Sequence, residues 1–230
     1  MKTSVMRKGI APAIAAFIIC PFLAGADGQE GWKLKKQKEG IEVYVRSIPG
    51  SKIDEFRGVM RVTGTRLSSL VAAFDDTPSY TRWMHECIEA RLVKRINLYE
   101  RLSYSVTRAP WPVWNRDLVT HSIVSQDPRS LAVTIRMEAR PGPDLVPLRE
   151  RTVRVPKMRG VWSFTPMESG EIIVSYRMHS DPGGSLPPGL ANMAVVDLPY
   201  YTLLNLRNIV RNEPYLSAVI PQVKEPKAAD

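Results

Sequence analysis

Histidine, cysteine and their acidic neighbours are the side chains of this 230-residue sequence that could support catalysis or bind a metal. His85, Glu86 and Cys87 are consecutive, but a nucleophile and its base must lie within hydrogen-bond reach, and neighbours on a strand or at a helix end diverge. His121 and His179 fall on separate expected strands, each on the face opposite the apolar residues, which favours surface hydrogen bonds over a metal site. We therefore expect Cys87 to be a small buried hydrophobic residue and expect no metal site.

The spacings that common enzymes require are absent. The sequence contains no G-x-S-x-G, no H-E-x-x-H, no paired C-x-x-C and no G-x-x-x-x-G-K. These absences argue against a hydrolase, a zinc enzyme and a nucleotide-binding enzyme, and we expect no cofactor.

An adjacent arginine and aspartate, Arg116 and Asp117, are the remaining charged candidates. Adjacent side chains of a strand point to opposite faces, so these two cannot hold one ligand together. Because buried charges normally require partners, we expect each to form a structural ion pair with another element.

Most of the elements that would position these residues are predicted to be strands. Leu131, Val133, Ile135 and Met137 alternate with polar side chains, which is the pattern of a half-buried strand. The same period of two occurs at 41–46, 53–62, 102–106, 162–164 and 172–178, with turn signals between the runs. We expect roughly six to nine antiparallel strands with one solvated face.

Helical spacing occurs in two regions. The first comprises 67–74, with Thr65 as the expected cap, and 80–85. The second, 188–211, is longer and is apolar over more than one stripe, so it must be covered on most sides or face something apolar that is not protein. Pro199 would kink this helix unless Asp197 caps a fresh start there.

Strands, short helices, further strands and one long final helix form an α+β architecture. One helix cannot fill the concavity of a twisted sheet of this size, so a cavity between them is expected. Ordinary core packing explains the inward alternation of most residues equally well, but an inward hydroxyl such as that of Thr120 or Ser122 needs a partner, which a ligand could supply. The residues expected to face inward are Leu102, Tyr104, Val106, Leu118, Thr120, Ser122, Val133, Ile135, Met137, Trp162, Phe164, Val174, Tyr176 and Met178, closed by Met193, Val196 and Tyr200.

The first 26 residues have the pattern of a secretory signal peptide. A basic start precedes an apolar run from Gly9 to Leu23, and Ala24-Gly25-Ala26 resembles a cleavage site. Cleavage before Asp27 predicts an exported, periplasmic protein; an uncleaved anchor is the alternative, although the run is short and interrupted by proline. Cys20 would leave with the signal, so the mature chain could form no internal disulfide and must be stabilised by its core.

The charge of the chain bounds its partners. The net charge is +9, and it falls to +6 when the three basic residues of the segment 1–26 are removed. This favours contact with anionic membrane surfaces, and the dispersed basic residues do not indicate nucleic acid. We expect a monomer, with a domain at 27–218 and a flexible tail at 219–230.

Three stretches make the sequence resemble the START domain family, named for steroidogenic acute regulatory protein-related lipid transfer. They are 80–85 (YTRWMH), 109–117 (APWPVWNRD), and the set formed by 159–162 (RGVW), 181–188 (DPGGSLPP) and the helix from Asn192 to Leu206. Their order and spacing match the family from about Trp32 to Tyr215. The resemblance implies a helix-grip fold, a curved antiparallel sheet around a long C-terminal helix, with an internal tunnel that binds or transfers one sterol, fatty acid or phospholipid without catalysis.

The resemblance also bears on the kind of lipid that the chain would bind. Some relatives have an inward arginine on the strand after Asn-Arg-Asp, where this chain has Leu118, Thr120 and Ser122, which favours a weakly polar ligand such as a sterol.

The loop 141–148 is expected to form a lid or a membrane-contacting finger, or else to pack on the final helix. A cavity enzyme of the aromatase/cyclase type is the alternative function, and a module whose helix docks on a membrane partner is a third. The predicted ligand-binding residues are Tyr104, Leu118, Thr120, Ser122, Val133, Ile135, Met137, Trp162, Tyr176, Met178, Met193, Val196 and Tyr200.

Overall fold

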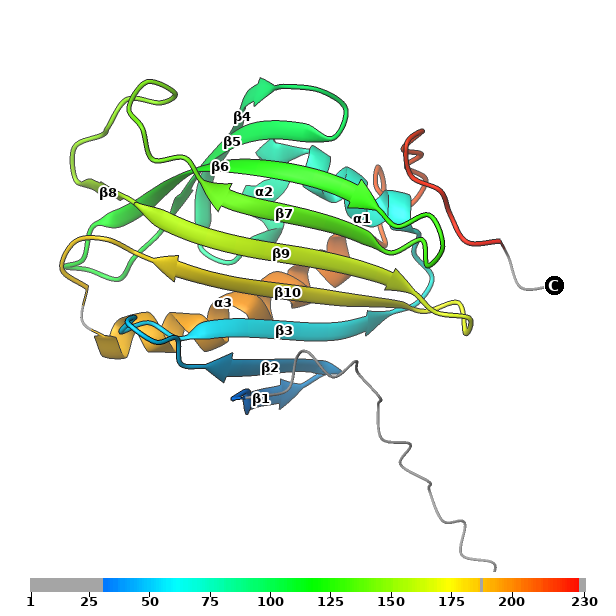
Figure 1. Ribbon diagram of the computed structural model, residues 1–230, viewed down its shortest axis with the longest axis horizontal. Coiled ribbons are helices and arrows are strands. Elements are labelled where there is room, and N and C mark those ends of the chain that lie inside the picture. The colour runs from blue at the N-terminus through cyan, green and yellow to red at the C-terminus, as the bar shows by residue number, and fades with distance from the viewer. Residues whose placement is uncertain (1–30, 187, 228–230) are drawn as a thin grey trace, which may run out of the picture. The chain divides into compact units, whose positions relative to one another are not determined.

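The computed structural model describes residues 31–186 and 188–227 (Figure 1), so the predicted signal peptide lies outside the described residues. The strands are β1 (Lys33–Lys38), β2 (Ile41–Arg46), β3 (Glu55–Val62), β4 (Cys87–Arg95), β5 (Glu100–Thr107), β6 (Asn115–Gln126), β7 (Val133–Ala139), β8 (Thr152–Arg154), β9 (Lys157–Pro166) and β10 (Ile172–Asp181). The helices are α1 (Leu67–Asp75), the 3-10 turn η1 (Thr77–Ser79), α2 (Tyr80–Trp83) and α3 (Pro188–Ile209).

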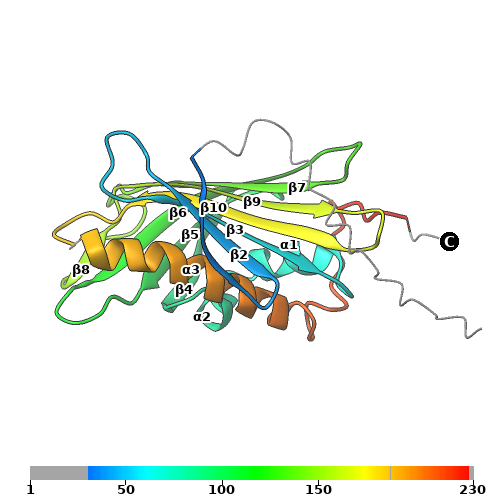
Figure 2. The same cartoon turned by 90° about the horizontal axis from the view of Figure 1, so that it is seen from below.

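The strands of the described part form one sheet in the order β1-β2-β3-β10-β9-β7-β6-β5-β4. Every pair on this path is antiparallel, and the short β8 adds a parallel pairing to the start of β6. The β3–β10 pairing joins the last strand of the N-terminal run β1–β3 to the last strand of the run β4–β10, two segments that are far apart in sequence. The helices lie on one side of this curved sheet, here called its concave face (Figure 2). The predicted fold class, a curved antiparallel sheet that grips a C-terminal helix, is confirmed.

The alternation of apolar residues explains the central strands. Val133, Ile135 and Met137 of β7 are buried, and the cross-strand register places Ile135 beside Trp162 and Tyr176 on the same face. The two edge strands of the sheet, β1 and β4, had no such signal. The sequence of β1, KLKKQK, is almost wholly polar, which suits an edge strand because lysine opposes pairing with another chain. Only one face of β4, the neighbour of β5 at the other edge, has any buried side chain.

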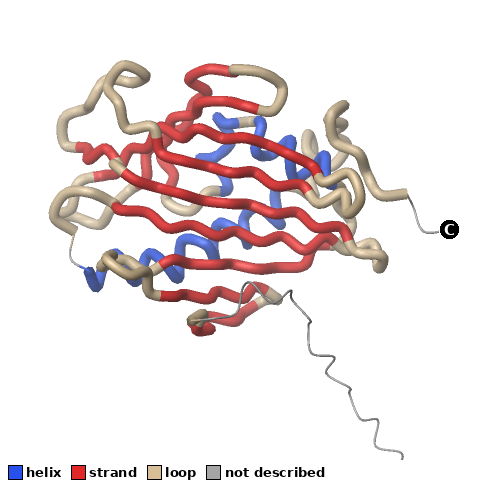
Figure 3. Tube along the Cα trace, viewed as in Figure 1, coloured by secondary structure: helices blue, strands red, loops and turns tan. Residues whose placement is uncertain are grey.

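The two short helices, α1 and α2, cover the part of the concave face toward β4, behind the sheet in Figure 3. The expected cap of α1 was wrong: Arg66 holds the N-cap position without a side-chain hydrogen bond. The Glu225 carboxylate instead accepts hydrogen bonds from the backbone N–H groups of Leu67 (3.0 Å) and Ser68 (2.7 Å). Ile220 and Val223 also pack against the core. The described part of the predicted tail, 219–227, thus contacts the domain through these residues.

Helix α3 is continuous from Pro188 to Ile209 with Pro199 in its interior. Asp197 does not cap a second helix there, because its carboxylate pairs with the Lys36 ammonium at 2.8 Å. The helix approaches β3 closely at Gly58, where an added Cβ would lie 2.6 Å from the Leu203 Cδ1 atom and 3.2 Å from the Pro199 Cβ atom. A glycine at this position therefore sets how closely the helix sits on the sheet. No helix among the described residues is both long and apolar enough to cross a membrane.

Candidate functional site

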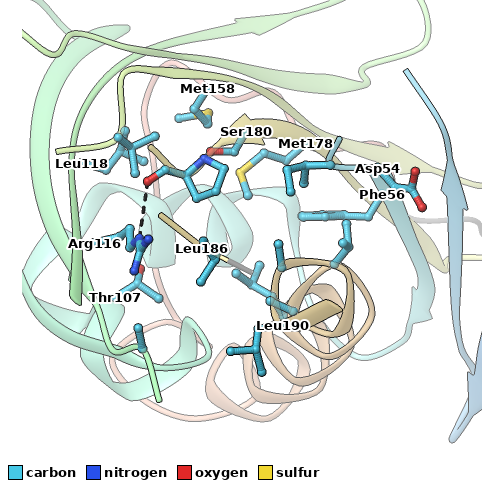
Figure 4. Close-up of a pocket in the computed structure, with 18 of the residues that line it drawn as sticks. Asp54, Phe56, Thr107, Arg116, Leu118, Met158, Met178, Ser180, Leu186 and Leu190 are labelled. Atoms are coloured by element: carbon cyan, nitrogen blue, oxygen red, sulfur yellow. Dashed lines mark hydrogen bonds between the residues drawn. The ribbon is translucent and has the colours of Figure 1, made fainter. Parts of the chain in front are cut away.

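A pocket of about 220 Å³ lies between the first half of α3 and one end of the concave face (Figure 4). Segments from the whole length of the domain meet there: the start of β3, the β5–β6 connection, β6, the β8–β9 region, β10, the segment 182–186 and α3. The apolar lining residues are Ile53, Phe56, Ala109, Pro110, Leu118, Val155, Met158, Met178, Pro182, Leu186, Leu190, Ala191, Ala194, Val195 and Leu198. The polar ones are Asp54, Thr107, Arg108, Arg116 and Ser180.

Beyond this pocket, buried side chains pack between the helices and the sheet. The Trp162 and Tyr176 rings stack with centroids 3.9 Å apart, and Phe74 of α1 meets the Trp162 ring edge-on at 4.9 Å. Trp83 of α2 and Leu203 of α3 are fully buried in the same core. The expected internal tunnel corresponds to this pocket, and beyond it aromatic side chains from the short helices pack on the concave face.

Two of the predicted ligand-binding residues, Leu118 and Met178, line the pocket. A second group faces the concave side as predicted but belongs to the packed core or lies beyond the pocket lining: Thr120, Ser122, Val133, Ile135, Met137, Trp162 and Tyr176. Burial raises the pKa of the Tyr176 hydroxyl, which donates a hydrogen bond to the Met178 sulfur at 3.3 Å. This hydroxyl therefore already has an acceptor within the protein.

The predicted orientation of Tyr104 was wrong, as it was for its neighbours Leu102 and Val106. Tyr104 pairs in register with Val119, and both pack with Val146 on the opposite, convex face. The loop 140–151 covers this part of the convex face, so β5 is buried on both sides. Alternation separates two faces but cannot say which one is concave when both are covered. The concave side of β5 carries Arg101, Ser103, Ser105 and Thr107 instead.

The loop 141–148 neither closes the pocket nor packs on α3. Val146 is buried at 3% exposure against Tyr104 and Val119, while Leu148 remains exposed. The expected lid is thus a cover for the convex face of β5 and β6.

The face of α3 that closes the pocket also differs from the predicted one. Met193 is 64% exposed, Val196 packs against the core outside the pocket lining, and the Tyr200 hydroxyl donates to the Glu39 carboxylate at 3.0 Å. Leu190, Ala191, Ala194, Val195 and Leu198 line the pocket instead. Because the helix is apolar over several stripes, its sequence left its rotation about its own axis undetermined.

Arg116 and Asp117 point to opposite faces, as predicted, but only one of them forms an ion pair. On the convex side, Asp117 accepts two hydrogen bonds from Arg154, at 2.8 and 2.9 Å. Arg116 points to the concave side and donates to the carbonyl oxygens of Trp114 (2.6 Å), Gly183 (3.2 Å) and Pro182 (3.4 Å), the last of which is drawn in Figure 4. Among the described residues no carboxylate lies within 4.0 Å of its guanidinium. The expected ion pair of Arg116 was therefore wrong.

The three histidines and Cys87 are not among the residues that line the pocket. The His121 imidazole lies 2.5 Å from the Glu100 carboxylate and the His179 imidazole 3.0 Å from the Ser51 hydroxyl, so each has its own partner. Burial raises the pKa of the buried Cys87 thiol to about 11. Within the described ranges, no three His, Cys, Asp or Glu side chains gather in a way that could hold a metal ion.

A curved antiparallel sheet that holds a C-terminal helix over an apolar pocket defines a helix-grip protein. Comparison of the chain with known proteins identifies its family. The START domain family model matches residues 22–196. A STAR-related lipid transfer protein fragment from Xanthomonas axonopodis superposes with a TM-score of 0.73 at 39% identity, covering 80% of this chain and 100% of that chain. An uncharacterized protein of Pseudomonas aeruginosa is 36% identical over 81% of this chain and 90% of its own length. The chain therefore belongs to the START domain family.

More distant relatives share the fold. Human STARD10 superposes with a TM-score of 0.71 at 19% identity, covering 82% of this chain and 76% of that chain. Mouse START domain-containing protein 10 is 23% identical over 74% of this chain, which spans only 58% of that relative's length.

Proposed function

We propose that this protein binds one lipid in the pocket beneath α3 and carries it between membranes without changing it chemically. The observation that carries the proposal is the pocket itself, whose lining is apolar except for five side chains. Membership of the START domain family supports lipid binding as the general function. Burial of about ten methylenes at about 0.8 kcal/mol each would contribute about 8 kcal/mol without any charged contact.

The size of the pocket bears on the ligand. Its volume of about 220 Å³ is smaller than the roughly 300–1,000 Å³ of pockets that enclose drug-sized ligands. A single acyl chain fits such a space better than the two chains of a phospholipid. A larger ligand would require α3 to move away from the sheet.

Identification of the bound molecule tests the proposal directly. The purified protein would be extracted with organic solvent, and the extract analysed by mass spectrometry. We expect an intact lipid at close to one equivalent, and the same lipid unchanged after prolonged incubation with the protein. Chemical conversion of the lipid would favour the aromatase/cyclase alternative, and an empty extract without uptake of sterols, fatty acids or phospholipids would contradict lipid carriage.

A substitution that fills the pocket provides the second test. Leu118→Trp adds a large side chain to the pocket lining, and we expect at least a tenfold fall in the amount of lipid that copurifies. Ile123→Trp is the matched control, because Ile123 lies on the same strand, is 42% exposed and is absent from the lining. Equal lipid content in both variants would mean that the lipid binds elsewhere.

We propose further that the rim of the pocket contacts anionic membranes during exchange. The β5–β6 connection lines the pocket through Ala109 and Pro110 and exposes Trp111 at 92% and Trp114 at 56%. Met193 of α3 is exposed as well. Indole rings favour the membrane interface, and the net charge of +6 that remains without residues 1–26 favours anionic lipid.

We also propose that the protein is exported. The segment 1–26 supports it through its basic start, apolar run and small residues before Asp27. The mass of the protein recovered from a periplasmic fraction tests it: a chain that begins at Asp27 is the expected result, and retention of residues 1–26 in a membrane fraction would indicate an anchor.

A further inference from the structure

The polar side of the pocket is formed by Arg116, a charged side chain in an unusual setting. Arg116 is only 9% exposed, although arginine is almost never buried without a partner of opposite charge. Its three hydrogen bonds all go to backbone carbonyl oxygens, which satisfy donors but carry no net charge. Burial lowers the pKa of the Arg116 guanidinium, but arginine stays protonated in proteins. The described part of the chain thus has a buried positive charge that no carboxylate neutralises.

The guanidinium has unused hydrogen-bonding capacity. Arginine has five N–H donors, and the three bonds use the one on Nε and one on each terminal nitrogen. One N–H on Nη1 and one on Nη2 therefore have no acceptor assigned among the described residues. Anionic oxygen atoms are the acceptors that pair most strongly with a guanidinium, and carboxylate or phosphate can receive both donors.

The other charged groups of the pocket do not offset the positive charge of Arg116. Asp54, the one acidic lining residue, accepts a hydrogen bond from the Ser47 hydroxyl, and its carboxylate in Figure 4 lies on the opposite side of the pocket from Arg116. Arg108 adds a second positive charge to the lining and has only a loose contact with Glu86, at 3.8 Å. The first turn of α3 also lines the pocket, and a helix begins with a partial positive charge.

We infer that the ligand is a single-chain lipid with an anionic headgroup, carboxylate or phosphate, whose oxygens pair with Arg116 while its chain fills the apolar part of the pocket. The inference rests on the proposed function and replaces the weakly polar sterol that the sequence of β6 favours. The main observation behind the inference is that Arg116 has no counter-charge among the described residues, so that the ligand would supply the negative charge. The pocket volume, which suits one chain, supports it independently.

Three probes with the same sixteen-carbon chain test the inference: palmitate, hexadecyl phosphate and hexadecanol. Their dissociation constants would be measured at pH 8 by displacement of a fluorescent fatty acid. We expect both anions to bind at least about tenfold more tightly than the alcohol, which corresponds to about 1.4 kcal/mol. Acetate and inorganic phosphate, which lack the chain, should not displace the probe at millimolar concentration.

Variants assign the preference to Arg116. We expect Arg116→Gln to abolish the preference for the anions while its hexadecanol affinity stays within about threefold of the wild-type value. Arg116→Lys should keep part of the preference because it keeps the charge. Arg159→Gln is the control, since Arg159 lies outside the pocket lining and its side chain is 87% exposed.

The outcomes separate the inference from the proposed function. Equal affinity of the wild-type protein for all three probes would overturn the inference and leave lipid carriage intact. A preference that survives in Arg116→Gln would also overturn it, because the anion would then bind elsewhere. If none of the three probes binds, single-chain carriage fails together with the inference.

Discussion

At the scale of single residues, Arg116 and Asp117 show how one step along a strand separates two environments. Asp117 faces the convex side, where Arg154 pairs with it at side-chain exposures of 1% and 7%. The same Arg154 donates to the carbonyl oxygen of Val146 and so holds the covering loop. Arg116 faces the pocket and has only carbonyl partners. The two charges thus have different settings: Asp117 is paired within the fold, and Arg116 is the charge that we infer to meet the ligand.

Loss of the Asp117 charge should destabilise the domain. Asp117→Asn would leave Arg154 buried without a counter-charge, and removal of one partner from a buried ion pair costs about 3–5 kcal/mol. Urea denaturation would measure the free energy of unfolding. Glu138→Gln is the control, because the Glu138 carboxylate is 56% exposed and lies 3.7 Å from the Arg159 guanidinium, so its loss should cost under about 0.5 kcal/mol. Similar stabilities for the two variants would argue against a structural role for Asp117.

The Cys87 thiol should be nearly inert in the folded protein. Only the thiolate reacts with disulfide reagents, and burial raises the thiol pKa to about 11, from about 8.5 in an unfolded chain. At pH 8 we expect the reaction to be on the order of 100-fold slower in the folded protein than in urea. A Cys20→Ala background ensures that Cys87 alone reports. Fast reaction without urea would show that the thiol is accessible and ionised.

At the scale of elements, the position of α3 determines whether the concave face is packed or open. Its second half contributes Leu203 and Leu206 to the core and lies directly on Gly58 of β3. Its first half has the small residues Ala191 and Ala194 over the pocket, so less of the space beneath it is filled. The pocket therefore results from the sizes of the side chains along one helix as well as from the curvature of the sheet.

A methyl group at Gly58 should push α3 away from the sheet. Gly58→Ala places Cβ within 2.6 Å of Leu203 and 3.2 Å of Pro199, and overpacking of a core costs about 1–3 kcal/mol. The control is Gly189→Ala, which meets nothing within 4 Å and replaces a poor helix former by a good one, so it should be neutral or stabilising. Thermal unfolding would compare the two. An unchanged midpoint in Gly58→Ala would contradict a close constraint of α3 by Gly58.

At the scale of the whole molecule, the pocket and the exposed tryptophans lie at the same end of the sheet. The β5–β6 connection, which contains Trp111 and Trp114, joins the strand ends opposite to the β4–β5 turn with Leu98 and Tyr99. A lipid could thus leave the pocket directly at a membrane that this end contacts. The positive net charge would strengthen that contact over distances of about one Debye length.

Vesicle binding should depend on salt and on the tryptophans. We expect binding to vesicles that contain 30 mol% anionic phospholipid to weaken as ionic strength rises, because the attraction between charges is screened. The double variant Trp111→Ser/Trp114→Ser should bind at least about tenfold more weakly, since each indole contributes buried apolar area at the interface. Leu98→Ser/Tyr99→Ser, at the opposite end, should bind like the wild type. Equal losses in both double variants would point to nonspecific adsorption.

Local patterns in the sequence were sufficient for the fold class. The period of two in β7 and β10, the long apolar stretch after Pro188 and the order of these elements predict a sheet that holds a final helix, because these periods depend only on neighbouring residues. The resemblance to the START family in the Asn-Arg-Asp block led to the same architecture. The opposite orientations of Arg116 and Asp117 also follow from adjacency alone.

Only the tertiary structure decided which faces enclose the pocket. Tyr104 alternates as an inward residue would, yet the 140–151 loop buries it on the convex face, and the several apolar stripes of α3 left its rotation open. Phe74 and Trp83 pack on the concave face through contacts between segments far apart in sequence, such as that of Phe74 with Trp162. The absence of a counter-charge near Arg116 among the described residues is likewise visible only in space, because burial and pairing depend on the positions of all surrounding groups at once.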